Sequence, residues 1–317
     1  MNRSNCRLRS MLKTLLLSPL CLFAPGWVGT AHSQIFIANN TSGLVSEYSL
    51  SGTELNPSFA TGLTEAFGVA TDGSYVYVSG VAAGNSAVIA KYDLSDNLIN
   101  IALVPSVYGP IVVQGGDLFT VDLTRPPSIG QYTNSGSPVN ASLFSFATGR
   151  QINGMAAGGD DLFFSYVLGP PINGVEGALN VAEYVRSTNT INDPFISGSG
   201  GAIGLAVDGD DLFLANSGGF VSEYSTSGNQ LSSSIIPGLN TPSALTIAGN
   251  DLFLVDEGTG TVGQYTTSGD AINPTIVTGL TGNIFSVAVV VPEPATISLL
   301  ALAGSALLLR RRHPREM

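Results

Sequence analysis

The stretch that decides the fold runs from residue 202 to residue 239 and reads AIGLAVDGDDLFLANSGGFVSEYSTSGNQLSSSIIPGL. It contains, in order, an apolar segment, an Asp/Gly turn, a segment carrying Phe213, a glycine loop, a segment ending in Tyr224, a Ser-Gly turn and a fourth extended segment. Residues 244–280, ALTIAGNDLFLVDEGTGTVGQYTTSGDAINPTIVTGL, follow the same order. Short runs of this kind between turn residues indicate strands. Each stretch therefore predicts one unit of four antiparallel strands.

Two aromatic markers extend this unit to six copies along the chain. The second strand carries an aromatic residue every 40 to 50 residues, and the third strand ends in tyrosine. Four short strands in a repeat of about 40 residues are typical of a propeller blade. The sequence therefore predicts an all-β, six-bladed β-propeller. The second-strand markers are Phe36, Tyr77, Phe119, Phe163, Phe213 and Phe253, and the third-strand markers are Tyr48, Tyr92, Tyr132, Tyr184, Tyr224 and Tyr265.

The two ends of the repeat array predict how the ring closes. The first copy begins directly on a second strand at residues 35–37, with no first strand before it. Residues 284–290, IFSVAVV, read as a first strand that has no copy of its own. We expect this C-terminal strand to complete the first blade, because closure removes the unpaired edges that an open sheet would expose.

The repeats resemble those of NHL-type six-bladed propellers. Residues 208–216, DGDDLFLAN, follow the Asp-Gly, Leu-Tyr-Val, Ala-Asp outline of such units, although this chain lacks the basic residue that they often carry on the third strand. The resemblance spans residues 35–290 and implies the fold. It implies no particular activity, because propellers include enzymes, scaffolds and receptors.

The composition of the body, residues 34–290, excludes several kinds of chemistry. Both cysteines and both histidines of the chain lie outside it. Disulfides, thiol nucleophiles, Ser-His-Asp catalysis and the usual zinc and iron ligand sets are therefore excluded. The body has four basic residues and all of the 23 acidic ones except Glu293 and Glu316, a formal charge of −17. Such a surface repels nucleic acid and anionic lipid.

The N-terminus reads as a secretory signal peptide over residues 1–33. Four basic residues precede an apolar run from residue 15 to residue 23, and Ala31 and Ser33 supply small residues before a cleavage site at Gln34. Cys21 could be read as a lipoprotein cysteine, but Leu20 and Pro19 stand where that signal requires small residues.

The C-terminus, residues 291–317, combines a proline-rich motif, an apolar run at 295–309 and a basic end. As a helix the run would span about 22 Å, against about 30 Å for the hydrocarbon core of a bilayer. The arginines should remain cytoplasmic, so the body would lie on the opposite side of the membrane. The motif consists of Val291, Pro292, Glu293 and Pro294, and the basic end begins with Arg310, Arg311 and Arg312.

This arrangement resembles the PEP-CTERM sorting tail of bacteria that make extracellular polymer. The resemblance implies export through the inner membrane, transient anchoring by the tail and processing by an exosortase-type membrane enzyme. It implies a final location at the cell surface or in the extracellular matrix. The alternative is a plain C-terminal membrane anchor.

The candidate ligand-binding residues follow the second strands or lie in the neighbouring loops. At the mouth of a propeller channel they would form a polar funnel for a sugar or a cation, and the alternative is that they cap backbone amides of their own loops. The insertion at residues 166–182 lengthens one loop on the same side. The candidates are Asn39, Glu65, Asp122, Arg125, Arg150, Asn216, Asp256 and Glu257.

The acidic turn at Asp208, Asp210 and Asp211 is a weak candidate for Ca²⁺, whose ligands are oxygen atoms. The alternative is that Asp and Gly serve a tight hairpin turn. No other cofactor is expected.

The leading hypothesis is an exported, non-enzymatic and monomeric propeller that binds polysaccharide, cations or another protein. The alternative is a metal-dependent lactonase, lyase or hydrolase that uses channel carboxylates. Such an enzyme should bring three or more of the candidates to one point. A passive matrix protein with no specific ligand is a third possibility.

Overall fold

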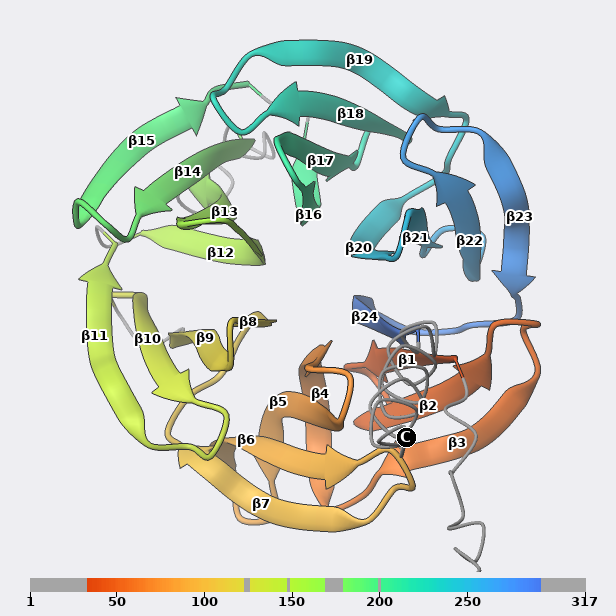
Figure 1. Ribbon diagram of the computed structural model, residues 1–317. Helices are drawn as coiled ribbons and strands as arrows, with labels where there is room; N and C mark the ends of the chain where they lie inside the picture. The colour runs from red at the N-terminus through yellow and green to blue at the C-terminus, as the bar shows by residue number, and fades with distance from the viewer. Residues whose placement is uncertain (1–32, 123–125, 147–148, 169–178, 199–200, 292–317) are drawn as a thin grey trace, which may run out of the picture. The chain divides into compact units, whose positions relative to one another are not determined.

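The computed structural model describes residues 33–122, 126–146, 149–168, 179–198 and 201–291. These residues form six four-stranded antiparallel sheets arranged in a ring, which confirms the predicted six-bladed β-propeller (Figure 1). Within these ranges the chain forms no helix, and so none that could cross a membrane. The predicted signal peptide and the predicted membrane segment at 295–309 lie outside the described residues.

Each blade runs from an inner strand beside the ring axis to an outer strand on the perimeter. In that order, the blades are β24 (Ile284–Val290), β1 (Gln34–Asn39), β2 (Leu44–Ser49) and β3 (Glu54–Ala60); β4 (Leu63–Thr71), β5 (Tyr75–Ala82), β6 (Ser86–Asp93) and β7 (Leu98–Pro105); β8 (Ile111–Gln114), β9 (Asp117–Asp122), β10 (Ser128–Thr133) and β11 (Pro138–Ser145); β12 (Arg150–Gly158), β13 (Asp161–Leu168), β14 (Leu179–Val185) and β15 (Thr190–Ile196); β16 (Ala202–Asp208), β17 (Asp211–Asn216), β18 (Phe220–Ser225) and β19 (Gln230–Pro237); and β20 (Pro242–Ala248), β21 (Asp251–Asp256), β22 (Thr261–Thr266) and β23 (Ala271–Val277).

The ring closes as the ends of the repeat array predict. Strand β24 pairs antiparallel with β1, so that Val290 lies opposite Gln34 and Val287 lies opposite Ile37. The first blade is thus built from both ends of the array. Because β24 fills the innermost position of that blade, all six blades have four strands.

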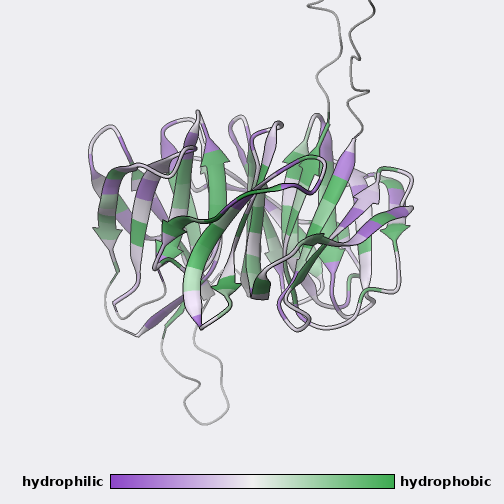
Figure 2. Ribbon diagram, turned by 90° about the horizontal axis from the view of Figure 1, so that it is seen from below, coloured by the Kyte–Doolittle hydropathy of each residue, from purple (hydrophilic) through white to green (hydrophobic). Residues whose placement is uncertain are grey.

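The aromatic markers of the second strands fill the spaces between blades. All six are at most 1% exposed. Phe253 of the sixth blade, for example, packs with Ile35 and Ile37 of the first. A second strand meets neighbours on both faces, so apolar residues occupy successive positions instead of alternating with polar ones. Figure 2 shows these apolar strands between the more polar turns at the two ends of the ring.

The end of the ring at which first strands turn into second strands is called the lower end here, and the opposite end is the upper end. The recurring Ser-Gly turns, which join third to fourth strands, lie at the lower end. Gly52 has φ 80°, and an added Cβ would lie 1.7 Å from the carbonyl oxygen of Ile276 in the preceding blade. Glycine recurs here because the turn needs a left-handed residue and also packs against its neighbour. Two blades lack this glycine, and there Asp96 and Asn189 adopt the positive φ.

The outer strands carry a second repeated feature, an exposed apolar residue followed in most blades by asparagine. Each outer strand is bulged relative to the third strand beside it. In β3, the Oδ1 atom of Asn56 accepts a hydrogen bond from the backbone of Ser58, and Asn140 does the same for Ser142 in β11. Bulges and local side-chain bonds make an edge strand a poor template for further pairing.

Candidate functional site at the upper end of the channel

The upper end of the ring is where the second strands end and the first strands begin. Seven of the eight predicted ligand-binding residues lie there in the described chain, at the ends of β1, β9, β17 and β21, directly after β21, or near the starts of β4 and β12. The eighth, Arg125, lies outside the described residues.

Asn39 and Glu257 both hold the segment that leads into the closing strand. The Nδ2 atom of Asn39 donates to the carbonyl of Thr281 at 2.7 Å, and its Oδ1 accepts from the backbone N–H of Ser42 at 3.1 Å. The Oε1 atom of Glu257 accepts from the backbone N–H of Ile284 at 2.8 Å. Both side chains therefore position the chain at the start of β24, the strand that closes the ring.

Asp256 caps the loop between the fifth and sixth blades. It is 7% exposed, and its two oxygens accept hydrogen bonds from the backbone N–H groups of Asn240 at 2.9 Å and Thr241 at 2.7 Å. A carboxylate that accepts two backbone hydrogen bonds stabilises the conformation of the loop, because charge-assisted bonds are stronger than neutral ones.

Asn216 is fully buried at the end of β17. Its Nδ2 donates to the Ser222 hydroxyl and to the carbonyl of Leu214, both at 2.9 Å. Its Oδ1 has no hydrogen-bond partner among the residues that the structure describes. This side chain thus fastens β17 to β18 inside the blade.

Glu65 and Asp122 act on nearby tyrosines. The hydroxyl of Tyr108 donates to the exposed Glu65 at 3.2 Å. Burial, together with the charge and hydrogen bond of Glu65, raises the pKa of Tyr108 to about 12. Burial also raises the pKa of Tyr132, with a further contribution from the charge of Asp122. Both tyrosines stay protonated at neutral pH.

Arg150 belongs to a three-residue cluster within the fourth blade. Its guanidinium pairs with Asp193 of the outer strand β15 and lies 4.3 Å from the ring centroid of Tyr166. The Tyr166 hydroxyl donates to the same carboxylate. Burial and this hydrogen bond raise the pKa of Tyr166 to about 12. The cluster ties the inner strands of the blade to its outer strand.

The predicted candidates do not meet at one point in the described chain. Asn39, Asp256 and Glu257 accept hydrogen bonds from backbone N–H groups, which agrees with the capping alternative for these three residues. Among the described residues, no group of three acidic side chains could hold a metal ion. Asp208 and Asp211 lie opposite each other across a two-residue hairpin turn that contains Asp210, at the lower end.

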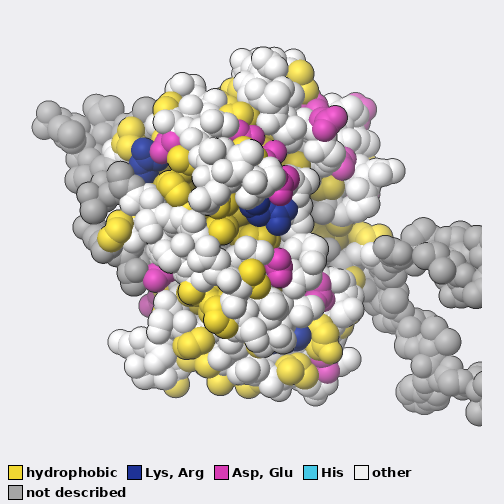
Figure 3. All heavy atoms as spheres, turned by 60° about the vertical axis from the view of Figure 1, so that its left-hand side comes forward, with side chains coloured by type: hydrophobic (Ala, Val, Ile, Leu, Met, Phe, Trp, Pro, Cys, Tyr) yellow, Lys and Arg dark blue, Asp and Glu magenta, His cyan; other side chains and the backbone are white. Residues whose placement is uncertain are grey.

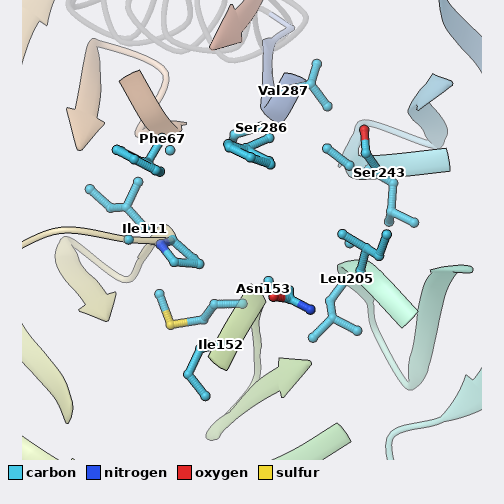
Figure 4. A pocket seen from close by; sticks show the side chains of 18 of the residues that line it. Phe67, Ile111, Ile152, Asn153, Leu205, Ser243, Ser286 and Val287 are labelled. Atoms are coloured by element: carbon cyan, nitrogen blue, oxygen red, sulfur yellow. The ribbon is translucent and has the colours of Figure 1, made fainter. Parts of the chain in front are cut away.

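The central channel was expected from the sequence, but the residues that line it were not predicted. Its upper part encloses about 310 Å³ and is lined by residues of the first strands, among them Phe67, Ile111, Asn153, Leu205 and Val287 (Figure 4). A lower part of about 250 Å³ continues along the same strands. An alignment of the six first strands identifies these positions, which carry few polar groups because the wall is largely apolar.

Cross-strand pairs at the lower end differ between blades. The first residue of the second strand lies diagonally across from the residue before the third-strand tyrosine, on the same face of the sheet. In two blades the pair is Asp with Gln, and the amide donates to the carboxylate at 2.7 Å, as Gln131 does to Asp117 and Gln264 does to Asp251. An amide beside a carboxylate satisfies both groups.

In the fourth and fifth blades the same position holds two carboxylates. Burial raises the pKa of Glu183, and the charge of Asp161 adds to the shift. Burial likewise raises the pKa of Glu223, with a contribution from Asp211. Elsewhere the acidic side chains are dispersed: Figure 3 shows them scattered among uncharged atoms over one face.

Comparisons with solved structures agree with the fold. The chain is similar to a chain of the nidogen/laminin complex (TM-score 0.61, 13% identity, 83% of this chain and 100% of that one). It is also similar to a candidate 6-phosphogluconolactonase from Bacteroides uniformis (TM-score 0.52, 13% identity, 82% and 99%). A third is the PQQ-bound aldose sugar dehydrogenase from Streptomyces coelicolor (TM-score 0.50, 14% identity, 71% and 85%).

No protein-family model matches the sequence, and no curated protein matches it. At 13–14% identity, the similarity to these structures shows a shared fold alone. The class that fold and site define is therefore a six-bladed β-propeller protein. Its activity has to be argued from its own residues, because propellers carry many functions.

Proposed function

We propose that this chain is an exported, non-enzymatic binding protein of the cell surface or extracellular matrix, and that its ligand is an extracellular polysaccharide. The observation that carries the proposal is that polar residues at the upper end fix the loops around the channel mouth. Asp256, Glu257 and Asn39 each hold a loop or strand end in place. Loops held in this way are preorganised, which lowers the entropy cost of binding.

The charge of the body restricts the partners. With a formal charge of −17, residues 34–290 repel anionic polymers unless a divalent cation bridges the two. Neutral glycans, or acidic glycans together with Ca²⁺, are therefore the polysaccharides proposed. Nucleic acid is not among the proposed partners, and the protein is proposed to act as a monomer.

Binding can be tested with residues 34–290, which contain every strand of the ring. A glycan array and calorimetry against exopolysaccharide, each with Ca²⁺ and with EDTA, should show saturable binding in at least one condition. The Arg150→Ala variant is the test of the upper loops, and Lys91→Ala, at the lower end, is its matched control. Absence of binding in all conditions, or hydrolysis of lactone substrates, would contradict the proposal.

The proposed export route rests on the two ends of the chain, which are outside the described residues. In cells that contain an exosortase-type enzyme, full-length protein should be shortened and recovered from the surface or medium. Glu293→Ala should leave the longer form in the membrane fraction, whereas Glu316→Ala should be processed normally. Equal processing of both variants would rule out the sorting motif.

A further inference from the structure

We propose that the upper chamber of the central channel is a binding site for a neutral small molecule with an apolar ring body and one hydrogen-bonding group. The site is distinct from the polar upper-end residues, and the inference does not depend on the proposed polysaccharide function.

The first observation is a set of β-bulges at one level of the channel. In five blades the first strand carries an extra residue relative to the second strand, shown by register shifts near its upper end, and β4 carries a second one, Thr64. Bulges re-aim side chains and are over-represented beside functional sites. One extra residue from each of these five blades lines the upper chamber, and the five are called the collar here: Phe67, Asn153, Ile203, Ser243 and Phe285.

Close packing between first strands makes the collar rigid. An added Cβ at Gly154, directly after Asn153, would lie 2.4 Å from the carbonyl oxygen of Ile203. One at Gly204 would lie 2.9 Å from the carbonyl oxygen of Ser243. Glycine after the bulge therefore lets neighbouring strands approach closely, and the chamber is formed before any ligand binds.

The chemistry of the wall specifies the ligand class. None of the residues that line the chamber is charged. The hydroxyl of Ser243 already donates to the carbonyl of Ile284, and that of Ser286 donates to Val69. The carboxamide of Asn153 makes no hydrogen bond with the other described residues, so it is free to donate and accept. The lining also includes the amide of Gln151, whose side chain is exposed, so Asn153 is the less exposed of the two amides in a largely apolar wall.

Aromatic residues form the wall opposite this amide. Phe67 and Phe285 are nearly parallel, with an interplanar angle of 6° and centroids 6.1 Å apart, and Tyr108 meets Phe67 edge-on at 3.9 Å. Blade 4, which carries Asn153, lies across the ring from blade 1, which carries Phe285. A ring-shaped ligand can therefore contact the aromatic side while its polar group reaches the amide.

Size and charge complete the assignment. The chamber volume of about 310 Å³ is at the lower end of the range for small-molecule pockets, which is about 300–1,000 Å³. The body charge of −17 and the absence of a cation in the wall disfavour an anion. The ligand is therefore neutral and no larger than about three fused or linked rings.

The test uses residues 34–290 and the neutral dye N-phenyl-1-naphthylamine, whose emission rises in apolar surroundings. We expect saturable 1:1 binding, and binding at least tenfold weaker for the anionic 8-anilinonaphthalene-1-sulfonate. Asn153→Leu, which keeps the volume but removes the amide, should weaken the neutral dye about fivefold, the effect of one hydrogen bond. Absence of binding, or equal binding of the two dyes, would overturn the proposal.

A matched pair of substitutions in the fifth blade locates the site. Ile203→Trp fills the chamber and should abolish binding. Leu231→Trp adds the same side chain on the outer strand, where Leu231 is 54% exposed, and should leave binding unchanged. If Ile203→Trp does not fold, Ser243→Phe fills the chamber from the next blade. Binding that survives a folded filling variant, or that methyl β-glucopyranoside displaces, would contradict the assignment.

Discussion

The two ends of the ring are organised in different ways. At the lower end one pattern recurs from blade to blade: the turn between the third and fourth strands has a left-handed residue, and in the first, third and sixth blades the glycine there packs on a backbone carbonyl of the preceding blade. At the upper end each blade has contacts of its own, such as the Asp256 cap and the Arg150 cluster. Residues that repeat maintain the ring, and residues that differ shape the surface available for binding.

The largest effect should come from a repeated lower-end contact. Gly52→Ala places a Cβ 1.7 Å from the carbonyl oxygen of Ile276 and also imposes left-handed strain of about 1–2 kcal/mol. Gly73→Ala is the matched control, because Gly73 has φ 82° and nothing within 4 Å of an added Cβ. In thermal denaturation, Gly52→Ala should lower the midpoint at least twice as much as Gly73→Ala. Equal losses would show that the contact between blades adds nothing.

An individual upper-end cap should have the next largest effect. Asp256→Ala leaves the backbone N–H groups of Asn240 and Thr241 without an acceptor, at a cost of about 1–3 kcal/mol. Asp256→Asn retains one acceptor oxygen and should lose less. Urea denaturation measures the difference between the two variants. A loss in Asp256→Ala below about 0.5 kcal/mol would mean that water replaces the carboxylate.

The Arg150 cluster should contribute less. Tyr166→Phe removes one hydroxyl that donates to Asp193 and should cost about 1 kcal/mol, since the Arg150 pair remains. Tyr265→Phe is the control, because the hydroxyl of Tyr265 makes no hydrogen bond to the other described residues. Equal denaturation midpoints for the two variants would show that the hydroxyl is replaceable.

The smallest effect should have the opposite sign. Glu223→Gln converts the carboxylate pair of the fifth blade into the Asp–Gln pair of the sixth. A raised folded-state pKa means that the folded protein holds the proton more tightly, so the wild type loses stability as pH rises through the titration of Glu223. The variant should therefore become the more stable protein near pH 7, with little difference at pH 3.

The reciprocal change tests the same rule in the sixth blade. Gln264→Glu places a carboxylate beside Asp251 and removes the amide that now donates to it at 2.7 Å. This variant should lose stability at pH 7 and recover part of it at pH 3. Thermal midpoints that do not depend on pH in either variant would show that the pairs are screened by solvent.

Features that depend on residues close together in the sequence could be predicted, and features that depend on residues far apart could not. The strands, the aromatic markers and the closing strand are set by local patterns of apolar and turn residues, and these patterns recur six times. The recurring Ser-Gly turns were visible, but their contact with the preceding blade was not, because Gly52 and Ile276 meet only when the ring closes. The candidate residues were placed at the upper end, whereas their partners were not predicted.

The sequence by itself determined an all-β chain of six blades, the order of its strands and the way its two ends join, because each depends on a short repeated pattern. Only the tertiary structure decided that Asp256, Glu257 and Asn39 bind nearby backbone groups. It also decided that five bulged first-strand residues meet around one apolar chamber. Successive members of this set are 40 to 86 residues apart in the chain, so only the curvature and closure of the ring bring them together.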